Sequence, residues 1–341
     1  MSNNIESGEY FKIFSDCIVV PGACFSAIYD LGRRSIHRFS SQHLDIVQSF
    51  ASGRSLSDLN GSAQTVLSYL KDIDAGIVTT EDECKRLPKI AESWASPYEI
   101  ENAIIDIDKV DHNYNSIISD LSELQCQSIQ VRGFSSRLNL NIVAIILDLA
   151  ATTTIDSVEI ILKWTPDFDP LLFAELVRKF PMLADLTVHS APNDETFDVN
   201  VESNGYRRTV TFVSEIIASA DACGRITRRT LTAPSAGLFF ELKNFNGCLN
   251  KKVSIAADGT VRNCPSLSMI HGLAGENSIK DLVRAPLFQS IWGIRKDDIT
   301  GCRDCEFRYV CTDCRAFLSQ DHSYDKPAKC GYDPYRGAWE S

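Results

Sequence analysis

The amino-acid sequence predicts an α/β protein with a winged-helix-like N-terminal domain, a shortened partial βα barrel and an irregular, cysteine-rich C-terminal domain. Three observations lead to this prediction. Apolar runs and three helical stretches fill residues 1–83, strand-like and helical patterns alternate over 116–247, and seven of the twelve cysteines fall in 248–341. Residues 84–115, which contain two prolines, are interpreted as a connector.

The N-terminal domain is predicted from the order of its elements. Short apolar runs come first, and helices are then expected from Ser40 through HLDIVQSF, over SLSDL (55–59) and over 63–73. The extended stretch AGIVTTE follows like the wing of a winged helix. Residues 41–74 hold two basic side chains against four aspartates, so DNA binding is not expected. A strand edge beside a helix groove favours recognition of a peptide.

The middle of the chain alternates between two hydrophobic periods. Strands are expected in SIQVRGF (128–134), SVEIILKW (157–164) and ADLTVHSA (184–191), with helices over 138–151 and 169–180 between them. This alternation predicts βαβ units and a parallel sheet. A fourth strand is expected in RTVTFVSE (208–215), and the connector ends in the strand AIIDID, whose Asp106 and Asp108 are expected on a solvated face.

Composition excludes several classes of function. The chain carries 34 basic and 45 acidic side chains, a net charge of −11, which disfavours nucleic acid as a partner. We expect neither secretion nor membrane insertion, because the N-terminus lacks a signal-peptide pattern and the apolar stretches are short. A cytoplasmic, reducing location is therefore expected, in which many cysteines indicate metal binding rather than disulfides. The scattered cysteines of the first half are interpreted as small buried residues: Cys17, Cys24, Cys84 and Cys126.

The cysteines of the last quarter form two patterns. In the first, ten residues separate Cys248 from Gly259 and four separate Gly259 from Cys264, and the intervening VSIAADGTVRNC predicts a β-hairpin with a turn at Asp258 and Gly259. The second pattern has two C-x2-C pairs five residues apart, followed by one distant cysteine: Cys302, Cys305, Cys311, Cys314 and Cys330. Two such pairs place four thiolates within reach of a common metal centre.

Together these patterns resemble the SPASM domain of radical S-adenosylmethionine (SAM) proteins. The sequence departs from that family's pattern at one point, because two residues rather than three separate Cys311 from Cys314. The resemblance implies two auxiliary [4Fe–4S] clusters. It places on the second cluster Cys302, Cys305, Cys311 and Cys330. It places on the first cluster Cys248, Cys264 and Cys314, with Cys223 as the candidate eighth ligand unless one iron stays open.

Zinc is the alternative metal, because short cysteine spacings are also typical of tetrahedral zinc sites. A single zinc ion would leave the pattern around Gly259 and the distant Cys330 unexplained. The six histidines show no metal-ligand spacing, and we expect them to be surface or core residues.

The cysteine triplet of radical SAM enzymes, C-x3-C-x2-C, does not occur in the sequence. The loop after the strand at 128–134 reads RGFSSRLN and holds no cysteine, and the pair Cys17 and Cys24 has another spacing. Reductive cleavage of SAM is therefore not expected. Residues 116–247 are also a short stretch for the complete partial βα barrel of a radical SAM enzyme.

A SPASM domain on a shortened barrel without the triplet resembles the SPASM-domain peptide maturases of grasp-with-spasm systems. YFKIFSDCIVVPGA, SWASPYEIENAIIDIDK and CLNKKVSIAADGTVRNCPS carry this resemblance, together with SVEIILKW and VHSAP. It implies a ribosomally synthesised precursor peptide and an ATP-grasp ligase as partners, with the leader of the precursor on the strand 36–39 and the helix 42–50. Two hypotheses stay open: an iron–sulfur peptide maturase, and a non-catalytic scaffold that presents the leader. No catalytic residue is assigned.

Overall fold

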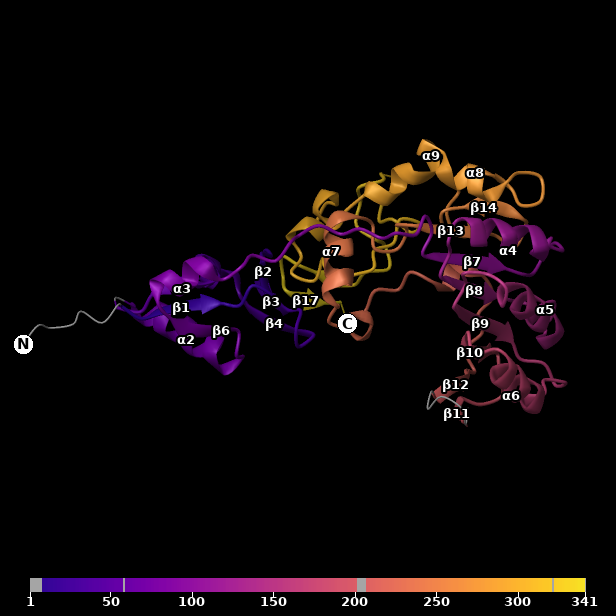
Figure 1. Cartoon of the computed structure of the whole chain (residues 1–341), viewed down its shortest axis with the longest axis horizontal. Coiled ribbons are helices and arrows are strands. Elements are labelled where there is room, and N and C mark those ends of the chain that lie inside the picture. Colours follow the sequence, from indigo (N-terminus) through magenta and orange to yellow (C-terminus); the bar gives the residue numbers. More distant parts are fainter. Residues whose placement is uncertain (1–7, 58, 201–206, 321, 341) are drawn as a thin grey trace, which may run out of the picture. The chain divides into compact units, whose positions relative to one another are not determined.

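The computed structural model of the chain describes residues 8–57, 59–200, 207–320 and 322–340. The fold is mixed α/β, with a large, mostly parallel sheet of nine strands (Figure 1). The chain forms two compact units, each assembled from separated segments. Unit 1 comprises Met1–Ala95, Arg225–Gly247 and Ile294–Ser341, and unit 2 comprises Ser96–Gly224 and Cys248–Gly293.

The nine-stranded sheet belongs to unit 2 and has the strand order β11-β12-β10-β9-β8-β7-β13-β14-β15. The strands from β12 to β13 in this order pair in parallel, and β11, β14 and β15 add antiparallel edges. The bounds are β7 Asn102–Asp106, β8 Ser128–Arg132, β9 Ser157–Lys163, β10 Leu183–His189, β11 Glu195–Asn200, β12 Arg207–Phe212, β13 Lys252–Ile255, β14 Thr260–Arg262 and β15 Gly272–Leu273.

Apolar side chains on the central strands build the core of unit 2. Ile105, Val131 and Ile160 lie in register on neighbouring strands, and each is at most 1% exposed. Figure 1 shows α4, α5 and α6 along one side of this sheet. The helices of unit 2 are α4 Tyr114–Glu123, α5 Leu140–Ala150, α6 Pro170–Lys179, α8 Ile279–Arg284 and α9 Pro286–Gln289, with the 3-10 helices η2 Ala220–Ala222 and η4 Ser290–Gly293.

Unit 1 begins with two small sheets and three helices. One sheet has the order β5-β1-β6 and the other β2-β3-β4. Phe11 and Phe50 pack edge to face in the core between them and α1, with ring centroids 5.6 Å apart. The elements are β1 Tyr10–Ile13, β2 Cys17–Val20, β3 Phe25–Asp30, β4 Ser35–Ser40, η1 Ser41–His43, α1 Leu44–Ser52, β5 Arg54–Ser55, α2 Gly61–Asp72, β6 Gly76–Thr79 and α3 Glu81–Arg86.

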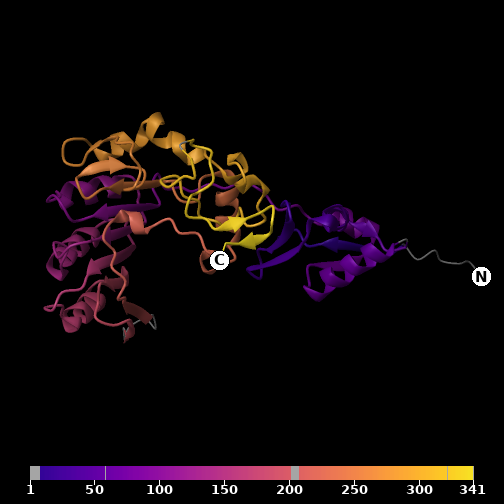
Figure 2. The same cartoon turned by 180° about the vertical axis from the view of Figure 1, so that it is seen from behind.

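The remaining segments of unit 1 contain short elements joined by loops, of which Figure 2 shows the C-terminal part at the yellow end of the colour scale. They are η3 Arg228–Thr230, α7 Ala236–Asn244, η5 Lys296–Asp298, η6 Cys302–Asp304, β16 Tyr332–Asp333 and β17 Ala338–Trp339. An aromatic cluster joins them to the N-terminal part, because the ring of Phe239 lies 5.2 Å from that of Tyr29 and 5.1 Å from that of Tyr309. The hydroxyl of Tyr29 also donates a hydrogen bond to the carbonyl of Glu306 at 2.8 Å.

The strands expected at 128–134, 157–164 and 184–191 are confirmed as β8, β9 and β10, and the helices expected between them as α5 and α6. The helix expected over SLSDL is wrong, because Arg54 and Ser55 instead form β5 and pair with β1. The solvated position expected for Asp106 is also wrong. Its carboxylate is buried at the end of β7, because Arg132 on β8 supplies two hydrogen bonds of 2.7 and 2.9 Å.

The compact units divide the chain at different points from the predicted boundaries. Residues 248–293, expected with the C-terminal domain, contribute β13, β14 and β15 to the sheet of unit 2. Residues 294–341 belong to the same unit as the N-terminal segment. The predicted cysteine-rich segment is thus shared between both units.

Candidate metal centres

The four cysteines assigned to the second cluster all lie in unit 1, and we call them the unit 1 group: Cys302, Cys305, Cys311 and Cys330. Cys302 begins η6, and its carbonyl accepts a hydrogen bond from the backbone nitrogen of Cys305 at 3.0 Å. Gly301 precedes this turn with φ 77°, a left-handed conformation that favours glycine. Residues 330 and 226 form an isolated bridge, which holds the distant cysteine of the group against another segment of unit 1.

The thiols of the unit 1 group interact with one another electrostatically. Burial raises the pKa of the Cys302 thiol to about 11, and the neighbouring Cys311 and Cys330 contribute to this shift. Burial likewise raises the pKa of Cys305, with contributions from Cys311 and Cys302. Because metals bind the deprotonated thiolate, metal binding at this group displaces protons.

A buried set of charged side chains lies beside the unit 1 group. The Nζ atom of Lys296 is 3.9 Å from the Sγ atom of Cys302 and 3.0 Å from Oδ1 of Asp313. Asp313 also accepts hydrogen bonds from the backbone nitrogen of Cys314 at 2.8 Å and from Nη2 of Arg315 at 2.7 Å. Lys296, Asp313 and Arg315 are each at most 5% exposed. The sequence pattern gave no sign of Lys296, because a single lysine outside the cysteine spacing carries no motif.

Three of the cysteines assigned to the first cluster lie in unit 2, and we call them the unit 2 group: Cys223, Cys248 and Cys264. Cys248 and Cys264 flank the hairpin of β13 and β14, whose expected turn is confirmed by Gly259 at φ 84°. Burial raises the pKa of the Cys264 thiol to about 11, and both other cysteines of the group contribute. Cys223 is exposed and follows η2.

A lysine amine also lies beside the unit 2 group. The Nζ atom of Lys252 on β13 is 3.9 Å from the Sγ atom of Cys248, the same separation as between Lys296 and Cys302. Lys252 is partly exposed, whereas Lys296 is buried. Each group therefore has a lysine amine close to one of its thiols, in two different environments.

Cys314, the remaining ligand assigned to the first cluster, belongs to unit 1 rather than to unit 2. Its side chain is buried. Within the described ranges, no three His, Cys, Asp or Glu side chains are arranged to share one metal ion. The cysteines of the first half are distant in the sequence from both groups. As expected, Cys17, Cys84 and Cys126 are buried. Cys24 is only half-buried.

The carboxyl ends of β7 and β8 carry the buried ion pair of Asp106 and Arg132 described above. The residues that follow these strands, 107–113 and 133–139, contain no cysteine. His189 at the end of β10 is fully buried, and its Nε2 atom lies 3.0 Å from the carbonyl oxygen of Gly133. This histidine therefore has a structural role, as expected.

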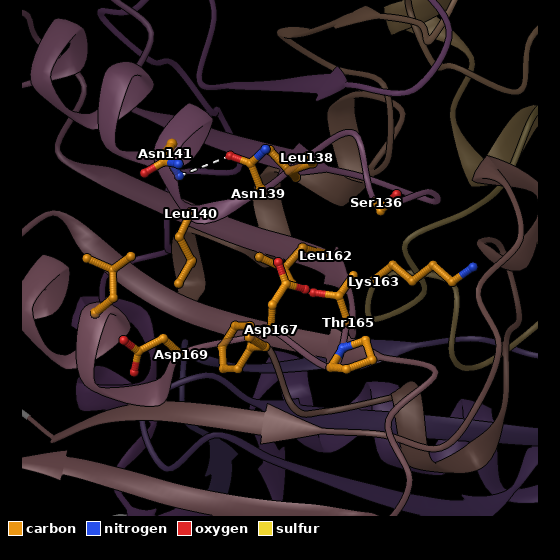
Figure 3. Close-up of a pocket in the computed structure, with 13 residues that line it drawn as sticks. Ser136, Leu138, Asn139, Leu140, Asn141, Leu162, Lys163, Thr165, Asp167 and Asp169 are labelled. Carbon is orange, nitrogen blue, oxygen red and sulfur yellow. Dashed lines mark hydrogen bonds between the residues drawn. The ribbon is translucent and has the colours of Figure 1, made fainter.

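A cavity of about 520 Å3 lies at the carboxyl ends of β8 and β9, beside the first turns of α5 and α6 (Figure 3). Ligands of parallel α/β sheets bind at this edge. Both helix starts are already capped, because Asn139 accepts a hydrogen bond from the backbone of Asn141 at 3.1 Å and Asp169 accepts one from Leu171 at 2.8 Å. In Figure 3 the side chain of Lys163 extends away from the other labelled residues. The cavity thus offers carboxylate, hydroxyl and amide groups rather than unpaired helix amides.

A second cavity has a volume of about 270 Å3, and two of the residues that line it are close in the sequence to cysteines of the unit 2 group. Asp221 and Pro265 line it, and they are two residues and one residue away from Cys223 and Cys264. Asp108 also lines this cavity, and its Oδ1 atom is buried with no hydrogen-bond partner among the described residues. Sequence reasoning missed this cavity, because strand alternation placed the acidic side chains in solvent.

The strand predicted to bind a leader peptide is β4, which lies at the edge of the sheet β2-β3-β4. The carbonyl of Arg38 on this strand accepts a hydrogen bond from the Tyr69 hydroxyl at 3.2 Å. On the other small sheet, the edge strand β6 exposes the apolar side chains of Ile77 and Val78. β4 and β6 are therefore two of the edge strands of unit 1 to which an extended peptide could be added.

No model of a known protein family matches the chain, and a search of curated proteins finds no significant match. None of the helices in the described ranges is long and apolar enough to cross a membrane.

Proposed function

We propose that this chain binds two [4Fe–4S] clusters and acts in the maturation of a ribosomally synthesised peptide, together with an ATP-grasp ligase in the cytoplasm. One observation supports the cluster sites most directly. Six of the seven cysteines in the two sequence patterns fall, together with Cys223, into the unit 1 group and the unit 2 group, and Cys314 is the exception. In each group, burial and neighbouring cysteines raise the pKa of at least one thiol.

The unit 1 group fits a cluster in its donor chemistry. Four thiols satisfy the four irons of one [4Fe–4S] cluster, and each thiolate binds a different iron. Such ligands lie further apart than ligands that share one ion, because the cluster has the larger volume. When bound, a cluster accepts or donates one electron at a time. The thiols of Cys302, Cys305, Cys311 and Cys330 would hold it, and the buried Lys296 would lie against it.

The unit 2 group offers three thiols, of which Cys248 and Cys264 flank the hairpin of β13 and β14 and Cys223 follows η2. The cavity lined by Asp221 and Pro265 gives a substrate group access to this side of unit 2. Its arginine, Arg262, donates hydrogen bonds to Leu267 at 2.7 Å and Thr260 at 2.8 Å, so that its position is fixed. We propose that this cavity receives a polar part of the peptide during maturation.

The N-terminal part of unit 1 is proposed as a winged-helix-like domain that binds the leader of the precursor. The edge strand β4 next to α1 supports this assignment, because an extended peptide can continue the sheet there. Hydrogen exchange with and without the precursor tests it. Binding at β4 would protect the amides of 35–40, whereas protection of 76–79 instead would move the peptide to β6.

The cluster assignment is tested by the visible spectrum of protein purified without oxygen. Two clusters give broad brown absorption that is lost on reduction with dithionite. A colourless protein that contains zinc would instead support the zinc alternative, because zinc has no redox change and no visible transitions.

A non-catalytic scaffold that presents the leader to the ligase is the second candidate function. The absence of cysteine from 107–113 and 133–139 favours it, because no triplet follows the strands β7 and β8. Incubating ligase and precursor with and without this protein separates the two candidates. A new mass on the peptide that needs this protein supports catalysis, and faster ligation with no further change in mass supports presentation.

A further inference from the structure

The buried charges around Asp313 do not balance. Lys296 and Arg315 carry one positive charge each, and Asp313 is the only carboxylate that pairs with either of them in the described part of the chain. The three side chains together therefore carry one net positive charge. All three are at most 5% exposed, so water does not screen this charge well. A buried charge is costly unless an opposite charge lies close to it.

The free cysteines provide the place for that opposite charge. The Nζ atom of Lys296 lies 3.9 Å from Cys302 Sγ, and the charges of Lys326 and Lys296 both oppose the rise that burial causes in the pKa of Cys330. Cys311 in turn acts on Lys296. Lys296 thus lies against one thiol of the unit 1 group, Cys302, and is near enough to Cys311 and Cys330 for their charges to affect one another. A cluster bound to four thiolates is anionic and gains one further negative charge when it accepts one electron.

We infer that Lys296, held by Asp313, is a positioning residue whose charge stabilises the reduced form of a cluster bound to the unit 1 group. This inference rests on the proposed function. Asp313 holds the ammonium group of Lys296 in place, because three other hydrogen-bond donors fix the carboxylate of Asp313. Its carboxylate accepts from the backbone of Cys314 at 2.8 Å, from Arg315 at 2.7 Å and, through Oδ2, from Asn246 at 2.7 Å.

Substitutions that change the buried charge by one unit test this role. Lys296→Met lowers the net charge of the set from one to zero, and Asp313→Asn raises it to two. The double variant Lys296→Met/Asp313→Asn restores a net charge of one, although it lacks both members of the native ion pair. A reductive titration with dithionite, followed by electron paramagnetic resonance, measures the midpoint potential of each protein. Iron and sulfide content is measured on the same samples.

The expected order of potentials is Asp313→Asn highest, wild type and double variant close together, and Lys296→Met lowest. Lys296→Arg, which keeps the charge, is expected to stay near wild type. Equal potentials in all variants would overturn the inference while leaving the cluster itself established. If Lys296→Met alone loses the cluster, the double variant is expected to recover it, and loss from both would contradict a role of charge. Wild-type protein without any iron–sulfur signal would remove the proposed function and this inference together.

Discussion

The two groups of cysteines share their chemistry but differ in what holds them. In the unit 2 group, Cys248 and Cys264 flank a hairpin of a nine-stranded sheet, whose core is built from apolar side chains such as Ile105, Val131 and Ile160. The unit 1 group lies in a segment of loops and short 3-10 helices, held by charged side chains such as Lys296 and Asp313. On the proposed function, a cluster at the unit 2 group would be attached to a folded sheet, whereas a cluster at the unit 1 group would contribute to the folding of its own loop-rich segment. Loss of the two clusters should therefore affect stability to different degrees.

The largest expected effect follows from removing a thiol of the unit 1 group. Cys305→Ala should lose the iron of one cluster and part of the hydrogen-exchange protection of residues 296–320, because a bound cluster would add to the apolar contacts, such as that of Tyr309 with Phe239, that hold this loop-rich segment. Structural metal sites contribute on the order of 10 kcal/mol to folding. Iron analysis and hydrogen exchange measure both losses. Cys126→Ala, which removes a buried thiol outside both groups, should keep the iron of wild type. Unchanged iron in Cys305→Ala would contradict the assignment.

The fold of unit 2 should instead depend on its own buried interactions. Arg132→Met leaves the carboxylate of Asp106 buried without its partner and should lower the free energy of unfolding by about 3–5 kcal/mol. Burial raises the pKa of Asp106, against the opposing charge of Arg132. A raised carboxyl pKa means that the native state holds a proton which the unfolded state releases. The loss of stability should therefore grow as the pH rises and shrink as it falls.

Denaturant unfolding at two pH values checks this prediction. Arg132→Met/Asp106→Leu is the matched control, because it removes the unpaired charge and should recover part of the stability. A deficit that is independent of pH would show that packing, and not the charge of Asp106, accounts for the effect.

A smaller effect on stability is expected from the unit 2 group. Cys264→Ala should reduce the iron content while the amides of β8, β9 and β10 stay protected from exchange, because the sheet keeps its apolar core. Loss of protection across the sheet would contradict the difference between the two groups. Together with Cys305→Ala, this variant shows whether each group contributes its own share of the iron.

The smallest effect is expected from the lysine of the unit 2 group. Lys252→Met should shift the potential of a cluster there by less than Lys296→Met shifts that of the unit 1 cluster, although both amines lie 3.9 Å from a thiol. Lys252 is partly exposed, so water screens its charge. The same reductive titration measures both shifts. An equal or larger shift for Lys252→Met would show that burial of the lysine does not determine how far its removal shifts the midpoint potential.

Much of the fold was predictable because periodicity reports on local burial. The strands β8, β9 and β10 and the helices α5 and α6 were expected from apolar runs at spacings of two and of three to four. The helix expected over SLSDL failed because pairing with β1 overrides the local pattern at Arg54 and Ser55. Division into two discontinuous units was beyond the sequence, because pairing of β13 with β7 joins residues about 150 positions apart.

The candidate sites were predictable to a lesser degree. Short cysteine spacing singled out the two C-x2-C pairs between Cys302 and Cys314, because thiols at such intervals are typical of metal sites. The division into two groups was implied by the resemblance to SPASM domains, and Cys223 was chosen as the nearest upstream cysteine. Lys296 and Asp313 could not be found in this way, because ion pairs between distant residues leave no periodic signal. The same holds for Asp106, whose burial depends on Arg132 on the neighbouring strand.

The most direct test of the account is the amount of iron, sulfide and zinc bound per chain after purification without oxygen. Two clusters predict about eight irons and about eight sulfides with no zinc. One or two zinc ions per chain without sulfide would contradict the account and would make both groups structural sites.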